Sequence, residues 1–182
     1  MPVLEIRRHS LRKNTGGSQL SQAGVDLARK VGAVMGPFAV VATSVVPRAR
    51  ETAIARGFAV DHELVMGPAT DPELYTELET VRWWTSDRPF AALAAVVGNG
   101  GPNHRYAHAL AAAWRDLMTP LQGNQSALVV GHSGDLEMGL VACLPYADHA
   151  SWGGEFGCCE GARLTFEGEP ARFCAVEFLR LS

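Results

Sequence analysis

The chain has 182 residues, a hydrophobic fraction of 47% and a formal net charge of -3, and this size favours one domain over residues 1–182. The charge balance argues against a nucleic-acid partner, and no apolar stretch approaches the roughly 20 residues that span a bilayer. The amino-terminal residues lack the pattern of a signal peptide and the four cysteines lack zinc-ligand spacing, so we expect a cytoplasmic protein with reduced thiols and no metal or other cofactor.

A strand is predicted over residues 2–7, and it ends at a cluster of charged side chains. Arg7, Arg8 and His9 follow its apolar residues directly. Cations beside an imidazole lower its pKa, so His9 is expected to stay neutral and nucleophilic while the arginines attract an anion. Strand alternation turns Arg7 away from Arg8, which favours a surface salt bridge for Arg7.

Helices and strands alternate in the next part of the chain. A polar stretch with a glycine pair indicates a loop, a serine caps the first helix, and a proline fits the first turn of the second. In chain order, the prediction is a loop over residues 10–19, a helix from Ser21 to Gly36-Pro37, a buried strand over residues 38–44 and a helix from Pro47 to about Gly57.

The second half of the chain continues this alternation after a middle segment with fewer periodic signals, residues 60–102. The prediction there is a short helix from Asp71-Pro72 through Leu78 and a helical piece over residues 90–97. After it come a helix over residues 104–118, a strand over residues 126–132, a helix over residues 135–144, and two strands within residues 161–181 around the turn 167–170.

This order of elements predicts a three-layer α/β/α sandwich with a mostly parallel sheet and an antiparallel strand near the carboxyl terminus. Ligands of such sheets bind beyond the carboxyl ends of the strands. Three predicted strand ends carry chemically distinctive residues: Arg8 and His9; Thr43, Ser44 and Arg48; and Gly131, His132 and Ser133.

Four of these residues suit phosphoryl transfer. Arg8 and Arg48 supply forked donors that match phosphate oxygens. One neutral imidazole, of His9 or His132, can attack phosphorus, while the other can offset charge on an equatorial oxygen.

In these motifs the sequence resembles the histidine phosphatase superfamily, the phosphoglycerate-mutase-like proteins of branch 1. The family opens with a strand and Arg-His-Gly, continues with Leu-Ser/Thr-x-x-Gly and Ser-x-x-x-Arg-Ala-x-x-Thr-Ala, and places its second histidine after Val-Val-Gly/Ser. The matching positions, in the same order, are Arg8-His9-Ser10, Leu20-Ser21-Gln22-Ala23-Gly24, Ser44 with Arg48-Ala49 and Thr52-Ala53, and Val129-Val130-Gly131-His132.

The resemblance implies a phosphoglycerate-mutase-like fold in which His9 is the phosphorylated nucleophile and Arg8, Arg48 and His132 form the phosphate pocket. Ser10 departs from the family glycine and places an extra side chain beside the nucleophile. The family's general acid is a glutamate some way past the second arginine, where three compete in this chain. We favour Glu77 over its rivals Glu73 and Glu79.

Structural interpretations are favoured for most other polar and aromatic residues. Trp83 and Trp84 are expected to pack within the middle segment rather than rim a pocket. Asp135 and Glu137 complement the dipole of their helix, although Glu137 could reach the crevice. The remaining histidines show no metal-ligand spacing and are interpreted as surface or core residues: His62, His104, His108 and His149.

The predicted function is therefore that of a metal-independent phosphatase, acting on a phosphomonoester or a protein phosphohistidine through a phosphohistidine on His9. The short middle segment favours an open pocket that takes bulky or varied substrates. A phosphoglycerate-mutase-like phosphotransfer is the alternative enzyme, but it needs extra cations, for which Arg12 and Lys13 are the candidates. A catalytically weak phosphate-binding or interaction module is the alternative outside enzymes.

Overall fold

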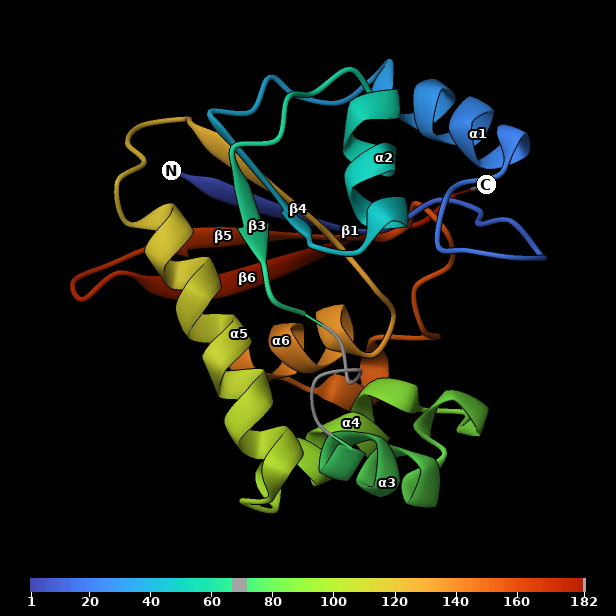
Figure 1. The fold of residues 1–182 in the computed structure, drawn as a ribbon. Coiled ribbons are helices and arrows are strands. Elements are labelled where there is room, and N and C mark those ends of the chain that lie inside the picture. Colours follow the sequence, from blue (N-terminus) through green and yellow to red (C-terminus); the bar gives the residue numbers. More distant parts are fainter. Residues whose placement is uncertain (67–71, 182) are drawn as a thin grey trace.

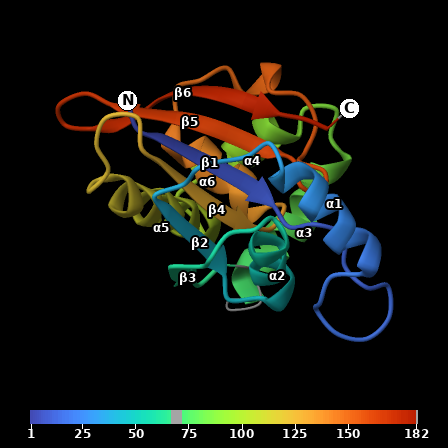
Figure 2. The ribbon, with the colours of Figure 1, turned by 90° about the horizontal axis from the view of Figure 1, so that it is seen from above.

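The sheet holds six strands in the order β3-β2-β4-β1-β5-β6 in a computed structural model that describes residues 1–66 and 72–181 (Figures 1 and 2). Their bounds are β1 Val3–Arg8, β2 Val40–Ser44, β3 His62–Leu64, β4 Ser126–Gly131, β5 Gly161–Glu167 and β6 Arg172–Leu179. Strands β1 to β4 are mutually parallel, whereas β5 is antiparallel to both of its neighbours. The predicted mostly parallel sheet with an antiparallel strand near the carboxyl terminus is confirmed.

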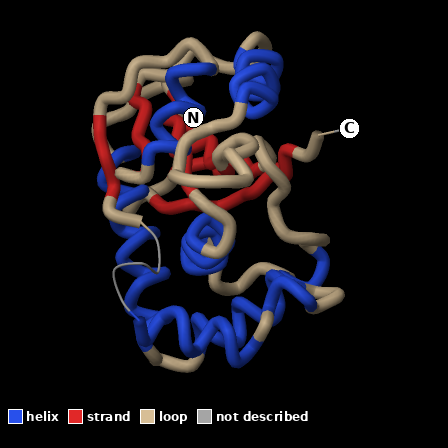
Figure 3. Tube along the Cα trace, turned by 45° about the vertical axis from the view of Figure 1, so that its right-hand side comes forward, coloured by secondary structure: helices blue, strands red, loops and turns tan. Residues whose placement is uncertain are grey.

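Helices cover both faces of this sheet (Figures 1 and 3). Helices α1 and α2 lie on one face and α5 and α6 on the other, with α3 and α4 outside α6. The bounds are α1 Gln22–Gly32, α2 Pro47–Ala55, α3 Pro72–Val81, α4 Pro89–Gly98, α5 Pro102–Met118 and α6 Asp135–Cys143, with short turns η2 Trp83–Thr85 and η3 His149–Ser151. None of the helices in the described part of the chain is long and apolar enough to cross a membrane.

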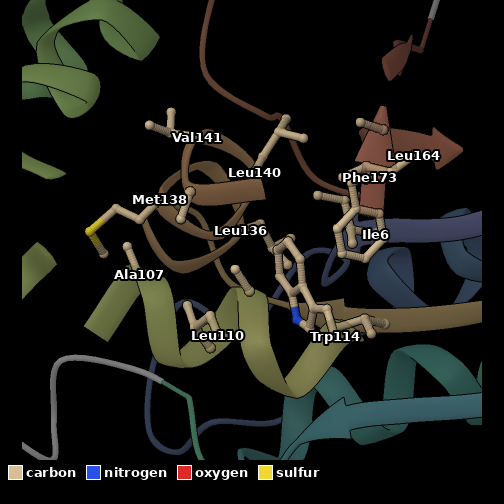
Figure 4. Packing of buried hydrophobic residues seen from close by; sticks show 14 of the residues in the cluster. Ile6, Ala107, Leu110, Trp114, Leu136, Met138, Leu140, Val141, Leu164 and Phe173 are labelled. Carbon is tan, nitrogen blue, oxygen red and sulfur yellow. The ribbon is translucent and has the colours of Figure 1, made fainter. Parts of the chain in front are cut away.

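Burial of α6 on all sides follows from its position between the sheet and α4. Ile6 on β1, Leu136 on α6 and Trp114 on α5 pack in one core cluster (Figure 4). A side chain at Gly139 would place its Cβ 2.5 Å from the Trp114 ring, so only glycine permits this approach of α5 to α6. The opposite face of the sheet buries a smaller apolar cluster under α2.

Three sequence-based expectations differ from the structure. Helix α1 ends at Gly32 rather than Gly36, and a Cβ at Gly32 would lie only 2.6 Å from the Arg56 backbone, which shows how tightly this helix end packs against the end of α2. Strand β3 was not predicted, because three residues at a sheet edge carry too short a pattern. Helix α3 continues past Leu78 to Val81; Asp71, its expected first residue, lies outside the described residues.

Arg7 also differs, because its salt bridge is buried rather than on the surface. The alternation along β1 does turn Arg7 away from Arg8, toward α1, whose Leu27 and Val31 line the same hollow as Arg7. There its Nε lies 2.7 Å from Glu5 Oε1, and both side chains are buried. Arg7 therefore contributes to the interior of the protein and not to an anion site.

The topology brings the three distinctive strand ends together. Strand β4 lies between β1 and β2, and the register pairs Arg8 with Gly131 and Thr43 with Val130. The carboxyl ends of three neighbouring parallel strands consequently meet at one edge of the sheet.

Candidate active site

His9 directly follows β1, and its two ring nitrogens have different partners. Nδ1 lies 2.6 Å from the Ser10 carbonyl oxygen, which requires Nδ1 to carry the proton and donate it. Nε2 accepts a hydrogen bond from Arg48 Nε at 3.0 Å. His9 is 7% exposed, so its environment holds one tautomer, with the lone pair of Nε2 directed to the guanidinium.

Ser10, the departure from the family motif, points away from His9 into the fold. Its hydroxyl donates to the Gly24 carbonyl at 2.7 Å, and its N–H donates to Thr52 Oγ1 at 2.9 Å. A Cβ at Gly24 would lie 2.0 Å from the Leu11 carbonyl oxygen, which explains the need for glycine at that position of α1. The serine side chain therefore ties the segment after His9 to α1, and Ser10 does not line the pocket beside His9.

Two arginines approach His9 from different elements. Arg48, in the first turn of α2, also donates from Nη1 to Ser18 Oγ at 2.9 Å, so the loop before α1 helps to orient it. Arg8 ends β1 and donates from Nη1 to the Phe156 carbonyl. Its Nε is buried without a hydrogen-bond partner among the described residues, which leaves donor capacity for an anion.

His132 follows β4 and completes the cluster. Its Nε2 lies 2.8 Å from Ser44 Oγ, and its ring centroid is 5.2 Å from that of His9. These side chains line a pocket of about 340 Å³, which we call the phosphate pocket; its lining residues are Arg8, His9, Leu11, Arg12, Asn14, Arg48, His132, Ser133 and Cys158. The geometry thus brings the four predicted pocket residues together and adds Arg12 to their rim.

Both imidazoles are held in the neutral form. Burial, reinforced by Arg48, Arg8 and Arg12, lowers the pKa of His9 to about 4, although the bond to Ser10 opposes the change. Burial and the charge of Arg48 lower the pKa of His132 to about 3. A neutral His9 can use its Nε2 lone pair as a nucleophile, and three nearby guanidiniums provide the positive charge that a phosphoryl group requires.

These pKa values predict a pH-dependent stability. The folded-state pKa of each histidine lies below its ordinary value of 6.5. The unfolded chain therefore binds more protons between about pH 6.5 and 4, and the folded state loses stability as pH falls through that range. His132→Asn removes one titrating ring and keeps a group that can bond to Ser44. Between pH 7 and 4 its free energy of unfolding should fall by roughly 2 to 3 kcal/mol less than that of the wild type, at about 1.4 kcal/mol per pKa unit.

Chemical denaturation across this pH range in phosphate-free buffer measures the effect. His62→Asn is the matched control, because His62 is exposed on the edge strand β3 and should leave the wild-type slope unchanged. If wild type and His132→Asn lose stability in parallel, the neutral state assigned to His132 is wrong.

The structure does not bring Glu77 to the phosphate pocket. Its Oε2 accepts a hydrogen bond from Asn103 Nδ2 at 2.6 Å, and it lines a separate surface hollow together with Glu73. Glu79 lines another hollow, next to the phosphate pocket. The role of Glu77 as general acid stays a prediction, and its contacts give it a structural role between α3 and α5.

Two carboxylates of α6 matter more to the site than the sequence indicated. Glu137 is fully buried and accepts hydrogen bonds from the Gly134 N–H at 2.7 Å and the Phe156 N–H at 2.9 Å. It therefore holds the segment whose carbonyl receives Arg8. Asp135 is 1% exposed and bonds to Tyr106, and burial raises its pKa to about 7. The position of Glu137 three residues after the helix cap signals its bond to the Gly134 N–H, but not its bond to the Phe156 N–H.

The other histidines have structural surroundings, as expected. His104 lies against His108, and its Nδ1 is 2.7 Å from the Val97 carbonyl oxygen. His149 packs on Trp152. In the described part of the chain, no group of three or more His, Cys, Asp or Glu side chains is arranged to hold a metal ion.

Comparison with known proteins identifies the fold. No protein-family model and no curated protein matches the sequence. Among solved structures, a phosphoserine phosphatase from Entamoeba histolytica in complex with 3-phosphoglyceric acid superposes with a TM-score of 0.67 at 14% identity, covering 100% of this chain and 98% of that one.

Two further solved structures have the same fold. A putative phosphohistidine phosphatase from Agrobacterium tumefaciens has a TM-score of 0.52 at 15% identity, covering 99% of this chain and 98% of its own. A phosphoglycerate mutase from Bacillus anthracis has a TM-score of 0.56 at 16% identity, covering 89% and 86%. The chain therefore has the fold of the histidine phosphatases and phosphoglycerate mutases.

Proposed function

We propose that this chain is a metal-independent histidine phosphatase, which hydrolyses a phosphomonoester or a protein phosphohistidine through a phosphohistidine on His9. The observation that carries the proposal is the state of His9. Its Nδ1 proton is bound by the Ser10 carbonyl while its Nε2 accepts a bond from Arg48 inside a pocket shared with Arg8 and His132. Neighbours with this fold include phosphatases for phosphoserine and, putatively, phosphohistidine.

The proposed reaction uses two displacements at phosphorus. Substrate oxygens replace His9 as the partner of Arg48, which frees the Nε2 lone pair to attack phosphorus as the bond to the leaving oxygen breaks. Arg8 and Arg48 bind the equatorial oxygens. The phosphoryl charge raises the pKa of His132, so that this imidazole can donate to the same group. Water then attacks the phosphohistidine, releases phosphate and restores neutral His9.

The structure also bears on the alternatives. An extra side chain at position 10 could weaken catalysis by crowding His9, but the Ser10 hydroxyl bonds to Gly24 outside the pocket. Arg12 lines the phosphate pocket and is one of the two cations that a mutase-like phosphotransfer was expected to need. Release of inorganic phosphate, rather than its transfer to a second hydroxyl, distinguishes hydrolysis from phosphotransfer.

Activity assays without added metal test the proposal. A screen at several pH values should include sugar phosphates, nucleotides, an aryl phosphate and a phosphohistidine peptide. We expect turnover that EDTA leaves unchanged and vanadate inhibits, because guanidiniums carry the charge stabilisation. Loss of activity with EDTA and its recovery with a divalent ion would show that the four-residue pocket is misassigned.

The remaining expectations are also proposals. We propose that residues 1–182 form one catalytic domain of a cytoplasmic protein, without a nucleic-acid or membrane partner. All four cysteines are free thiols, which is consistent with a reducing compartment.

A further inference from the structure

A second hollow lies beside the phosphate pocket, and Ser133 lines both. We call it the aromatic hollow; its volume is about 250 Å³. Its apolar wall consists of Tyr75 and Leu78 from α3, Trp83 and Trp84 from η2, and Met138 from α6. Because the two hollows share a wall residue, a ligand whose phosphoryl group sits against His9 can extend its other end into the aromatic hollow.

The aromatic side chains of this wall are arranged to contact a ligand. Trp83 is 4% exposed and packs edge-to-face on Trp84, with ring centroids 6.1 Å apart. Trp84 and Tyr75 are 38% and 54% exposed. When an apolar ligand covers large solvent-exposed rings in the wall of a concave site, burial of their surface favours binding. Trp83 also belongs to the buried core cluster, and this packing limits the movement of η2.

Asp135 is the polar group in the same wall. Its Oδ1 accepts the Tyr106 hydroxyl at 2.9 Å, while Oδ2 is buried without a hydrogen-bond partner among the described residues. The carboxyl group interacts electrostatically with Arg48, the partner of His9 Nε2. Its raised pKa, about 7 because of burial, lets it carry a proton near neutral pH. An unpartnered buried oxygen at this position indicates an interaction completed by substrate.

We propose that the aromatic hollow is the leaving-group subsite, that it selects phosphomonoesters of alcohols with an uncharged aromatic or large apolar group, and that Asp135 protonates the leaving oxygen. Glu79, which also lines the aromatic hollow, opposes an anionic leaving group. The inference rests on the proposed phosphatase function and names the substrate class of that same site.

The Nε2 lone pair of His9 forms the N–P bond, the P–O bond to the leaving oxygen breaks, and its electron pair stays on that oxygen. The Asp135 proton passes to this oxygen to give the neutral alcohol and an Asp135 carboxylate. In the second step, the carboxylate takes a proton from water while the water oxygen attacks phosphorus and the N–P bond breaks. Enzyme and proton count are then restored.

Two alkyl phosphates with leaving oxygens of similar basicity test the subsite: 2-(1-naphthyl)ethyl phosphate and ethyl phosphate. We expect kcat/KM to favour the naphthyl compound by about 30-fold or more, because only its ring system fills the aromatic hollow. Trp84→Ala and Tyr75→Ala should each reduce the ratio of the two kcat/KM values by about tenfold. Tyr146→Ala is the matched control, because Tyr146 is an exposed aromatic residue outside the hollow. It should change kcat/KM for neither substrate.

The role of Asp135 is tested by the basicity of the leaving oxygen. Asp135→Asn should lower kcat/KM for 2-(1-naphthyl)ethyl phosphate by about 30-fold or more, because an alkoxide is a poor leaving group without a proton. For 1-naphthyl phosphate, whose leaving oxygen is far less basic, kcat/KM of the variant should stay within about threefold of the wild-type value. If Asp135 had only a structural role, the substitution would lower kcat/KM for both substrates alike. Equal losses would therefore overturn the role of Asp135 as proton donor.

The outcomes separate this inference from the proposed function. Turnover of both alkyl phosphates at similar kcat/KM would overturn the subsite and leave the phosphatase function standing. If no phosphate ester is hydrolysed, the proposed function fails, and calorimetric binding of 2-(1-naphthyl)ethanol still decides the subsite. Binding that Tyr75→Ala weakens and Tyr146→Ala does not would support the aromatic hollow, and no binding to the wild type would overturn it.

Discussion

His9→Asn should abolish turnover, with a loss of kcat of about 1000-fold or more for every phosphomonoester that the wild type hydrolyses. The asparagine amide can still donate to the Ser10 carbonyl, as His9 Nδ1 does at 2.6 Å. It has no lone-pair nitrogen to replace Nε2. The substitution therefore removes the nucleophile and keeps the hydrogen bond that orients this loop, so we expect a folded protein that binds phosphate but does not turn over.

Rapid quench with labelled substrate gives a second measurement of the same prediction. Wild type should yield a protein-bound phosphoryl group that is labile in acid and stable in base, and His9→Asn and His9→Ala should yield none. His62→Asn is the control, since His62 lies on the exposed edge strand β3. Turnover by the His9 variants at more than a few per cent of the wild-type rate would assign the nucleophile elsewhere.

Arg48→Lys should lower kcat/KM by about 30-fold to 1000-fold, although it keeps the positive charge. Arg48 now donates from Nε to His9 and from Nη1 to Ser18, and its planar fork can grip two phosphoryl oxygens. Lysine offers a point contact instead. Losing one charge-assisted hydrogen bond to the transition state costs roughly 2 to 4 kcal/mol, which corresponds to that range of rates. An equal loss in kcat would indicate a contact made only in the transition state.

A matched control lies two residues along the same helix. Arg50 is exposed, and its Nη1 pairs with Glu63 at 3.1 Å on the surface. Arg50→Lys should therefore stay close to wild type in both activity and thermal stability. Steady-state kinetics with an aryl phosphate measure the activity of both variants, and thermal melts measure their stability. A folded Arg48→Lys protein within about threefold of wild type would place Arg48 outside the phosphate pocket.

The phosphate pocket could be predicted because its residues directly follow elements with strong local signals. The apolar runs that became β1, β2 and β4 are long enough to identify as buried strands, and Pro47 marks the start of α2. Parallel strands end at one edge of the sheet, so the positions of Arg8, His9 and His132 followed from the order of elements alone. The structure then placed β4 between the other two strands.

The surroundings of three other residues depend on contacts between segments far apart in the chain. Arg7 is buried beside α1, where it pairs with Glu5. Glu137 holds the Phe156 N–H, a contact across 19 positions that no local pattern marks. Glu77 had a suitable distance in sequence from Arg48, but its carboxylate bonds to Asn103 on α5.

Local chemistry and long-range packing thus account for different properties of this protein. The periodicity of apolar residues and the caps of helices specify the elements, and the residues at strand ends specify the kind of anion they can bind. The protonation states of His9 and Asp135 depend on burial instead. His9 and Asp135 acquire lowered and raised pKa values because α2, α5 and neighbouring loops exclude water from them. Desolvation is a property of the assembled interior, and short stretches of sequence carry no record of it.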